Sequence, residues 1–289
     1  MLVLFTDTDT DLTPREAKKY GYRLISMPYC IGAETVYPYE DFEKFDSHAF
    51  YDMLRAGTMP TTTLLSVERY ISYFEPVFAN GDDILYVHFS AAMTSTFGIM
   101  ETALAALREK YPERKFYSVD TLGITIESLN IVKEIGDLHL AGASADDIVL
   151  WADKEVGRFA TYFFAEDLKF FARSGRVGGI AAFMGGLFGV RPIICMNSEG
   201  RMVSVGKEKG RNNALSRLVS IVEELGDDIE NHRIIIGHTD APELAQTLGC
   251  MLYEKFGGNL NIEYAVVNPT AGSHCGPDGV GVCFHAKHR

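Results

Sequence analysis

LVLFTDTDTDLTPREAKKYGYRLISMPYCI, residues 2–31, is the stretch that decides the fold. It starts and ends with an apolar run, and between these runs the segment 13–21 is rich in helix-forming residues. Thr13 is placed to cap a helix, with Pro14 at its first position and Glu16 completing a capping box. An apolar strand, a helix and a second apolar strand make up the unit from which parallel sheets are built.

The same alternation continues through the first half of the chain. Apolar runs predict further strands, and amphipathic runs predict helices, over these segments: strands 83–89 and 115–120, helices 66–78, 93–111, 125–141 and 144–159. Short strands that are apolar on both faces are typical of a parallel sheet covered by helices. We therefore predict an α/β, Rossmann-like N-terminal domain over residues 1–158.

The order of elements changes after about residue 160. The patterns predict helices at 165–176, 213–226 and 241–257, and strands at 191–197, 233–240, 261–268 and 279–287. This succession no longer alternates strictly and favours an α+β arrangement. We predict a smaller C-terminal domain over residues 159–289.

Composition limits the classes of partner. The net charge of −12 argues against nucleic acid as the main ligand. The five cysteines form no CxxC pair, which favours reduced thiols and a cytoplasmic protein. The N-terminus lacks the basic flank and long apolar run of an export signal. The least polar stretch, 177–190, is too short to span a bilayer.

Hydroxyl and carboxylate side chains gather where predicted strands end or helices begin. They occur in DTDTD (7–11), TTT (61–63), SAAMTST (90–96) and DT (120–121). Ligands collect at the carboxyl ends of parallel strands, and helix N-termini favour anions there. Simple helix capping is the plain alternative for each cluster. A glycine-flanked histidine, His274, is a candidate metal ligand, catalytic base, anion ligand or loop filler.

Two hydrolytic functions fit parts of this pattern. DTDTD resembles the first motif of haloacid-dehalogenase-type phosphohydrolases, in which Asp7 would attack phosphorus and Asp9 would help to hold Mg²⁺. The late acidic pair that such enzymes need has no well-placed candidate here. A serine hydrolase would need an activated serine beside His274, and no GxSxG elbow occurs.

Metal and dinucleotide sites have weaker support. Cys283 and His285 would share one face of a strand, with His288 beyond them, but no second ligand cluster is identifiable. The glycine-rich segment 276–282 has the wrong spacing for a dinucleotide-binding loop and precedes a strand.

The order of the motifs along the whole chain resembles the DegV family. The matching segments are TDTDTDL (6–12), PTTTLLS (60–66), FSAAMTSTF (89–97), VDTLGIT (119–125), LKFFARSGRVGG (168–179), RPIICMNSEG (191–200), GHTD (237–240) and GSHCGPDGVGVCF (272–284). The most specific of them are 168–179 and 272–284.

The resemblance implies a protein that binds a long-chain fatty acid between its two domains, with no cofactor and no catalysis of its own. It implies that the carboxylate is presented to a separate ATP-dependent fatty acid kinase subunit, and that the acyl phosphate feeds bacterial phospholipid synthesis. Burial of the tail would contribute about 0.8 kcal/mol per CH₂ group. A buried carboxylate would need hydroxyl and N–H partners.

The resemblance also assigns site residues. It places Thr62, Thr63, Thr94 and Ser95 as ligands of the fatty-acid carboxylate, and His274 beside the same head group. It gives head-group support or kinase docking to three further residues: Ser90, Arg176 and Arg211. The segment 180–189 would line the tail.

Some positions differ from the family pattern or lie outside the site. Leu64, Leu65 and Ala91 replace residues that the family usually has near the head group. Lys207, Lys209 and Arg211 form a basic patch that would steer the kinase or a transient membrane contact.

Overall fold

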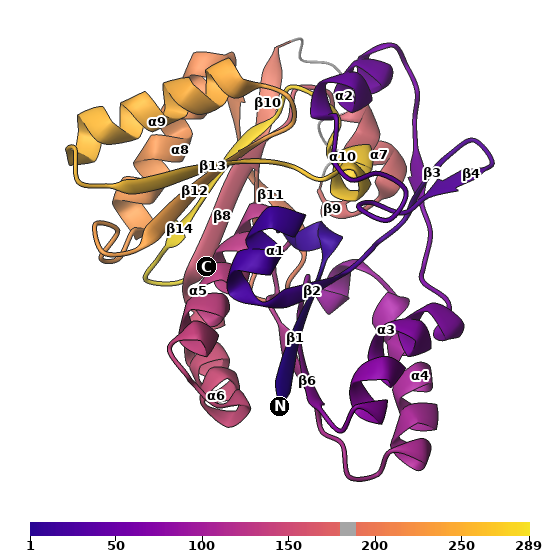
Figure 1. Ribbon diagram of the computed structural model, residues 1–289. Coiled ribbons are helices and arrows are strands. Elements are labelled where there is room, and N and C mark those ends of the chain that lie inside the picture. Colours follow the sequence, from indigo (N-terminus) through magenta and orange to yellow (C-terminus); the bar gives the residue numbers. More distant parts are fainter. Residues whose placement is uncertain (180–188) are drawn as a thin grey trace.

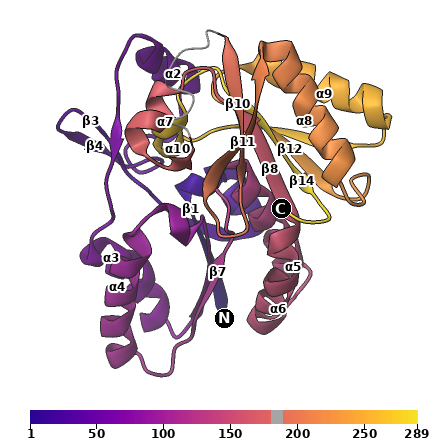
Figure 2. The ribbon, with the colours of Figure 1, turned by 180° about the vertical axis from the view of Figure 1, so that it is seen from behind.

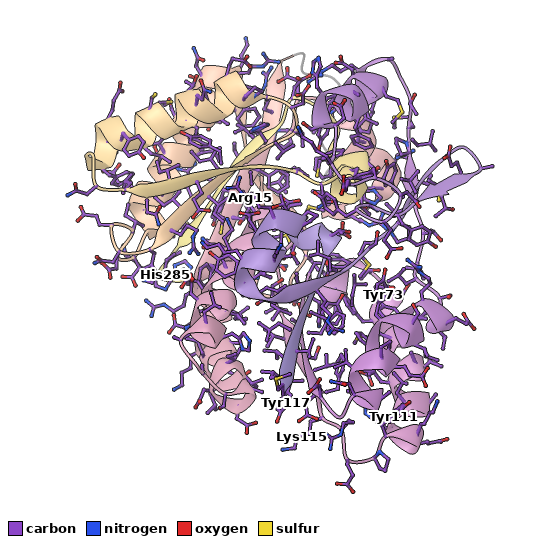
Figure 3. The ribbon with its side chains drawn as sticks, in the orientation of Figure 1. Arg15, Tyr73, Tyr111, Lys115, Tyr117 and His285 are labelled. Carbon is purple, nitrogen blue, oxygen red and sulfur yellow. The ribbon has the colours of Figure 1, made fainter. Side chains whose placement is uncertain are left out.

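A parallel sheet of four strands, in the order β2-β1-β6-β7, forms the centre of the N-terminal half. Its strands are β1 (Leu2–Asp7), β2 (Tyr22–Ile25), β6 (Asp83–His88) and β7 (Phe116–Asp120). The computed structural model describes residues 1–179 and 189–289 (Figure 1). Lys115 and Tyr111 lie at the amino end of this sheet (Figure 3). The predicted α/β class is confirmed.

Helices cover both faces of the parallel sheet. They are α1 (Pro14–Tyr20), α3 (Val67–Ala79), α4 (Thr96–Lys110), α5 (Ile126–Leu140) and α6 (Ala145–Glu155). α3 and α4 pack on one face around Phe5 and Phe74, and α1, α5 and α6 pack on the other around Leu4. The predicted cap of α1 is present, since Thr13 Oγ1 accepts a hydrogen bond from the Glu16 N–H at 3.3 Å.

The C-terminal half contains a mixed sheet of seven strands, in the order β13-β12-β14-β8-β10-β11-β9. Its strands are β8 (Phe159–Phe164), β9 (Val177–Gly178), β10 (Val190–Met196), β11 (Met202–Lys209), β12 (Arg233–His238), β13 (Asn261–Val266) and β14 (Val280–His285). Helices α8 (Arg211–Leu225) and α9 (Pro242–Phe256) cover its outer face (Figures 1 and 2).

Helix α5 packs between the two sheets. Its hydrophobic residues join one core with Leu4 and Leu85 of the parallel sheet and with Ile235 and Cys283 of the mixed sheet. Every residue from 126 to 133 is buried, as expected for a helix covered on all sides. Because α5 contacts both sheets, the division at residue 158 stays a prediction.

A third, small sheet and three short helices lie beside the parallel sheet. The order of the small sheet is β4-β3-β5. The elements are β3 (Tyr29–Ile31), β4 (Glu34–Val36), β5 (Thr61–Thr62), α2 (Ser47–Arg55), α7 (Lys169–Ser174) and α10 (Pro269–Cys275). Three 3₁₀ turns complete the described elements: η1 (Thr8–Thr10), η2 (Ala91–Met93) and η3 (Val156–Arg158). None of the described helices combines the length and apolar composition needed to cross a membrane.

The prediction of one strand over residues 22–31 is wrong. The Met27 N–H donates to Thr8 Oγ1 at 2.9 Å, and the Ser26 hydroxyl donates to the Pro38 carbonyl at 2.7 Å. Pro28 has no N–H to give to a sheet. The run therefore divides into β2 and β3, which belong to different sheets. Elements β8, β11, α2 and α10 were not predicted either.

Candidate ligand-binding site

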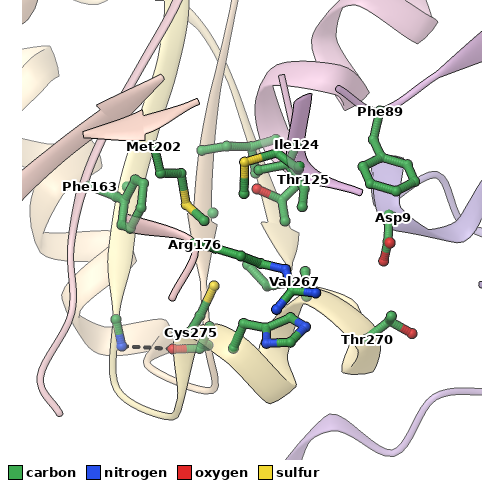
Figure 4. A pocket seen from close by; sticks show the side chains of 18 of the residues that line it. Asp9, Phe89, Ile124, Thr125, Phe163, Arg176, Met202, Val267, Thr270 and Cys275 are labelled. Carbon is green, nitrogen blue, oxygen red and sulfur yellow. Dashed lines mark hydrogen bonds between the residues drawn. The ribbon is translucent and has the colours of Figure 1, made fainter. Parts of the chain in front are cut away.

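A cavity of about 1180 Å³, including the space at its mouth, lies among η1, β5, the start of α4, α10 and the mixed sheet (Figure 4). The carboxyl end of β1 points toward this cavity through η1, as expected for a ligand site on a parallel sheet.

Most of the cavity wall is apolar. The larger apolar side chains come from both halves of the chain: Met27, Phe89, Met93, Ile124, Ile126, Phe163, Phe164, Phe171, Met196, Met202, Val267 and Val280. Arg176, His274, Asp9 and several threonines interrupt this wall. The cavity thus suits an apolar molecule with a polar end.

Thr62 and His274 form a polar pair in the wall. A hydrogen bond of 3.0 Å joins Thr62 Oγ1 and His274 Nε2, and His274 Nδ1 has no partner among the described residues. Burial lowers the pKa of His274 to about 3, and the charges of Arg176 and Arg173 add to the effect. The imidazole is therefore neutral at physiological pH and a weak base. It offers one nitrogen to the cavity region as a hydrogen-bonding group.

Arg176 brings a positive charge to the same region. The half-buried guanidinium donates from Nη1 to the Ser174 carbonyl at 3.2 Å, and no carboxylate of the described residues pairs with it. Burial lowers its pKa, but an arginine stays charged in proteins. Figure 4 shows the Arg176 side chain reaching into the cavity. This end of the cavity is suited to an anionic group.

Arg173 is a site residue that the sequence analysis missed. Its Nη1 donates to the Met59 carbonyl at 2.6 Å, and its Nη2 donates to the carbonyls of Pro60 and, at 3.2 Å, Ser273. Met59 and Pro60 precede β5, and Ser273 precedes His274 in α10. Arg173 therefore holds together the two segments that carry the Thr62–His274 pair. In the sequence, Arg173 stands two residues before Gly175 and three before Arg176, and this closeness to a predicted site residue was the available indication.

The remaining hydroxyl candidates do not all face the cavity. Thr63 and Thr94 line it, and so does Thr96, whose Oγ1 lies 2.9 Å from the Tyr70 hydroxyl. Ser95 is exposed and does not line the cavity. Its side chain makes no capping hydrogen bond to α4.

Ser90 and Arg211 lie outside the cavity wall. The buried Ser90 hydroxyl donates to the Gly200 carbonyl at 2.8 Å, which ties η2 to the turn before β11. Arg211 is exposed and pairs with Glu166 at 3.1 Å. Neither residue contacts the polar end of the cavity, so a role for Arg211 would be at the surface.

Asp7 is not placed to act as a phosphohydrolase nucleophile. It is fully buried and absent from the cavity wall. Its Oδ1 accepts from the Asp9 N–H at 3.0 Å, and its Oδ2 accepts from the Tyr86 hydroxyl at 3.0 Å and the Phe89 N–H at 3.2 Å. These bonds make Asp7 a structural cap of η1. Burial raises its pKa to about 7.

The structure also disfavours the serine hydrolase and the tail metal site. His274 pairs with a threonine, and the neighbouring Ser273 hydroxyl donates to the Pro269 carbonyl at 2.8 Å. His285 stacks on His232 with ring centroids 3.8 Å apart, while the Cys283 thiol lies 3.7 Å from Asn130 Nδ2.

A group of three potential metal ligands elsewhere is already occupied by a cation. It comprises His48, Asp52 and Asp240. Arg55 Nη1 lies 2.7 Å from both carboxylates, so its charge already stands where an ion would bind. The predicted tail-lining segment, 180–189, falls almost wholly on 180–188, outside the described residues.

Comparisons with known proteins agree on one family. The model of the DegV family matches residues 1–287. A DegV domain-containing protein of Clostridium perfringens is 30% identical over 283 residues, covering 98% of this chain and 96% of the relative. A DegV domain-containing protein of Lactococcus lactis is 25% identical over 289 residues, covering 99% and 98%.

Solved structures share the fold over the full chain. A DegV family protein from Thermus thermophilus, described as fatty acid binding, has a TM-score of 0.87 at 20% identity, with 99% of each chain covered. A stearic acid-binding protein from Eubacterium ventriosum has a TM-score of 0.87 at 18% identity, with 99% of each chain covered. A fatty acid binding DegV family protein from Streptococcus agalactiae has a TM-score of 0.84 at 22% identity, covering 100% of this chain and 99% of that one.

Proposed function

This chain belongs to the DegV family, and from that premise we propose that it binds a long-chain fatty acid in the cavity between its sheets. The observation that carries the proposal is that Thr62, His274 and Arg176 place polar groups in a mostly apolar cavity wall. The description of three structurally similar proteins as fatty acid or stearic acid binders supports the same ligand class.

The physical terms of such a complex are favourable. A tail of about fifteen methylene groups would contribute up to about 12 kcal/mol on leaving water. Association and ordering of the chain offset part of this gain. The carboxylate loses its hydration, and Arg176 together with the threonine hydroxyls would replace it with charge-assisted hydrogen bonds. Thr62, Thr63 and Thr94 are the proposed hydroxyl ligands, and His274 orients Thr62.

We further propose that the bound carboxylate is presented to a separate ATP-dependent kinase subunit in the cytoplasm, which forms the acyl phosphate. The low pKa of His274 supports a binding role, because a weak base would not activate the carboxylate or a nucleophile. The exposed Lys207, Lys209 and Arg211 are the proposed docking surface. The loaded protein incubated with ATP alone should give no acyl phosphate that hydroxylamine can trap.

The decisive experiment is native mass spectrometry of freshly purified protein, followed by solvent extraction and lipid analysis. We expect a one-to-one adduct that releases a free fatty acid. Thr62→Val should weaken palmitate binding by about tenfold or more, because one hydrogen bond to a charged group is lost. The matched control is Ser95→Ala, which changes an exposed hydroxyl outside the cavity and should bind as the wild type does.

Two results would count against the proposal. Protein that stays free of lipid after incubation with a panel of fatty acids would refute the ligand class. Equal losses of affinity in Thr62→Val and Ser95→Ala would refute the assignment of the carboxylate to this part of the cavity.

A further inference from the structure

Asp9 is a buried acid in the cavity wall whose carboxyl group makes no hydrogen bond within the described part of the chain. Its main chain is fixed, because its N–H donates to Asp7 Oδ1 at 3.0 Å and its carbonyl accepts from the Thr125 N–H at 2.9 Å. Its side chain is 6% exposed, and Oδ1 has no hydrogen-bond partner among the described residues. Buried polar atoms without a partner are rare, and each calls for a physical explanation.

The backbone that holds Asp9 is itself unusual. Thr125 adopts φ 53° and ψ −125°, a conformation that is rare for residues with a side chain. Its N–H binds the Asp9 carbonyl, and its own side chain lines the same cavity. Strained residues persist where the surrounding structure fixes them and often lie at ligand sites. Asp9 is therefore held toward the cavity by a contact that has a conformational cost.

Arg176 faces Asp9 without pairing with it. Asp9 and Arg176 both line the cavity, and Figure 4 shows their side chains there. No hydrogen bond or ion pair of the described residues joins the two side chains. Within residues 1–179 and 189–289, the cavity wall thus contains an acid and a cation that are not paired with each other.

An ionised Asp9 would disfavour the proposed ligand. A carboxylate buried without hydrogen-bond donors is costly, and a second carboxylate brought near it would be repelled. Burial raises the pKa of Asp9 well above its ordinary value, Asp7 and Asp11 raise it further, and Arg176 opposes them. The neutral acid has one O–H to donate and finds no acceptor on the described part of the protein.

We propose that Asp9 is a ligand of the fatty-acid head group, donating its carboxyl O–H to the ligand carboxylate while Arg176 contacts that carboxylate from the other side. The complex then holds one proton between two carboxyl groups. This inference rests on the proposed function, since it assumes that a carboxylate occupies this end of the cavity. It makes Asp9 a residue that selects a hydrogen-bond-accepting head group.

A dependence of affinity on pH follows. Where free Asp9 is ionised, binding must take up one proton from solution, so affinity falls as pH rises, by up to about tenfold per pH unit. At lower pH, where free Asp9 already carries its proton, affinity is flat. A free fatty acid is ionised across pH 6–9, because ordinary carboxyl pKa values are about 4.

Other titratable groups surround this site. On η1 and the elements packed against it they are Asp7, Asp11, Tyr70, Tyr86, Glu127, Arg176, His274 and Cys275. The pKa of His274 is about 3 and that of Cys275 about 12, so neither titrates between pH 6 and 9. Burial raises the pKa of Asp7 and of Asp11 to about 7 and that of Glu127 to about 8, so all three titrate in that window. A variant must separate their effect from that of Asp9.

The test is calorimetric titration of lipid-free protein with palmitate at pH 6 to 9, in buffers of different ionisation enthalpy. The wild type should take up a proton on binding at every pH at which free Asp9 is ionised. Asp9→Asn keeps a donor of the same shape, and should bind at pH 6 within about threefold of the wild type, with neither the pH slope nor the proton uptake. Asp9→Leu should bind about tenfold or more weakly at pH 6.

Asp11→Asn is the matched control, because it removes a neighbouring buried acid. Its amide oxygen can still accept the two hydrogen bonds from Asn268, at 2.8 and 2.7 Å. This variant should keep the proton uptake of the wild type. A proton uptake that persists in Asp9→Asn, or an affinity of Asp9→Leu at pH 6 equal to that of the wild type, would overturn the role of Asp9. Failure of the wild type to bind palmitate at any pH would instead overturn the proposed function.

Discussion

Arg173 offers a strict test of how the site is assembled, because it lies behind the Thr62–His274 pair. Arg173→Met keeps most of the aliphatic stem and removes the donors to the carbonyls of Met59, Pro60 and Ser273. These donors link the start of β5 to α10 directly behind the pair. We expect the fold to persist and the site to loosen.

The magnitude follows from the bonds that are lost. A hydrogen bond from a charged group contributes about 1.5–3 kcal/mol, and water compensates for part of this at an exposed side chain. Since Arg173 is exposed, we expect the whole bridge to contribute about 1.5–3 kcal/mol to the free energy of unfolding. Palmitate affinity should fall about fivefold, as expected when one supporting interaction of about 1 kcal/mol is lost from the ligand site.

The assay combines calorimetric binding of palmitate with NMR titration of the His274 imidazole. Arg173 is one of the charges that lower the pKa of His274, so Arg173→Met should raise that pKa. Arg201→Met is the control. This arginine is exposed, and its ion pair with Glu199 is long, at 4.0 Å, so its loss should have little effect. Wild-type affinity together with an unchanged His274 titration in Arg173→Met would show that the bridge does not position the pair.

Two further predictions concern the cavity mouth and the end of α10. Leu64 lines the cavity and is 44% exposed, so Leu64→Asp should slow palmitate uptake from vesicles severalfold. Leu150 on α6 is 57% exposed and lies outside the cavity wall, so Leu150→Asp should leave the uptake rate unchanged. Gly276 has φ +72°, and a Cβ added there would stand 2.4 Å from the Phe170 ring, so Gly276→Ala should lower the free energy of unfolding by at least about 1–2 kcal/mol in denaturant titrations. A Cβ added at Gly258 would have no atom within 4 Å, so Gly258→Ala should leave the free energy of unfolding unchanged. Equal effects of Leu64→Asp and Leu150→Asp, or of Gly276→Ala and Gly258→Ala, would contradict these predictions.

The α/β class could be predicted because its determinants are local. Apolar runs located β1, β6 and β7, amphipathic runs located the helices between them, and a capping box located the start of α1. The apolar run over 22–31 was wrongly predicted as one strand. It divides into β2 and β3 because of hydrogen bonds to Thr8 and Pro38, which lie outside the run. Strand β8 was missed because the predicted helix 144–159 was continued through Gly157, whereas α6 ends at Glu155 and η3 leads into β8.

The polar pair of the site had no local pattern to reveal it. Thr62 and His274 are 212 positions apart, and the resemblance to a family brought them together where periodicity had no means to do so. The spacing of DTDTD correctly marked a cluster of acids at the end of β1. It could not say that Asp7 would turn into the protein and Asp9 into the cavity, since this depends on Tyr86 and Phe89.

Thr94 and Ser95 show how finely the fold divides neighbouring hydroxyls. Thr94 is extended, with φ −153° and ψ 159°, and at Ser95 the backbone turns into α4 with φ −100° and ψ 4°. Thr94 and Thr96 line the cavity, and Ser95 between them is exposed. A cluster of hydroxyls in a sequence therefore predicts a polar site without identifying its ligands. The direction of each side chain is set by the turn into α4, which is why Ser95→Ala serves as the control for Thr62→Val.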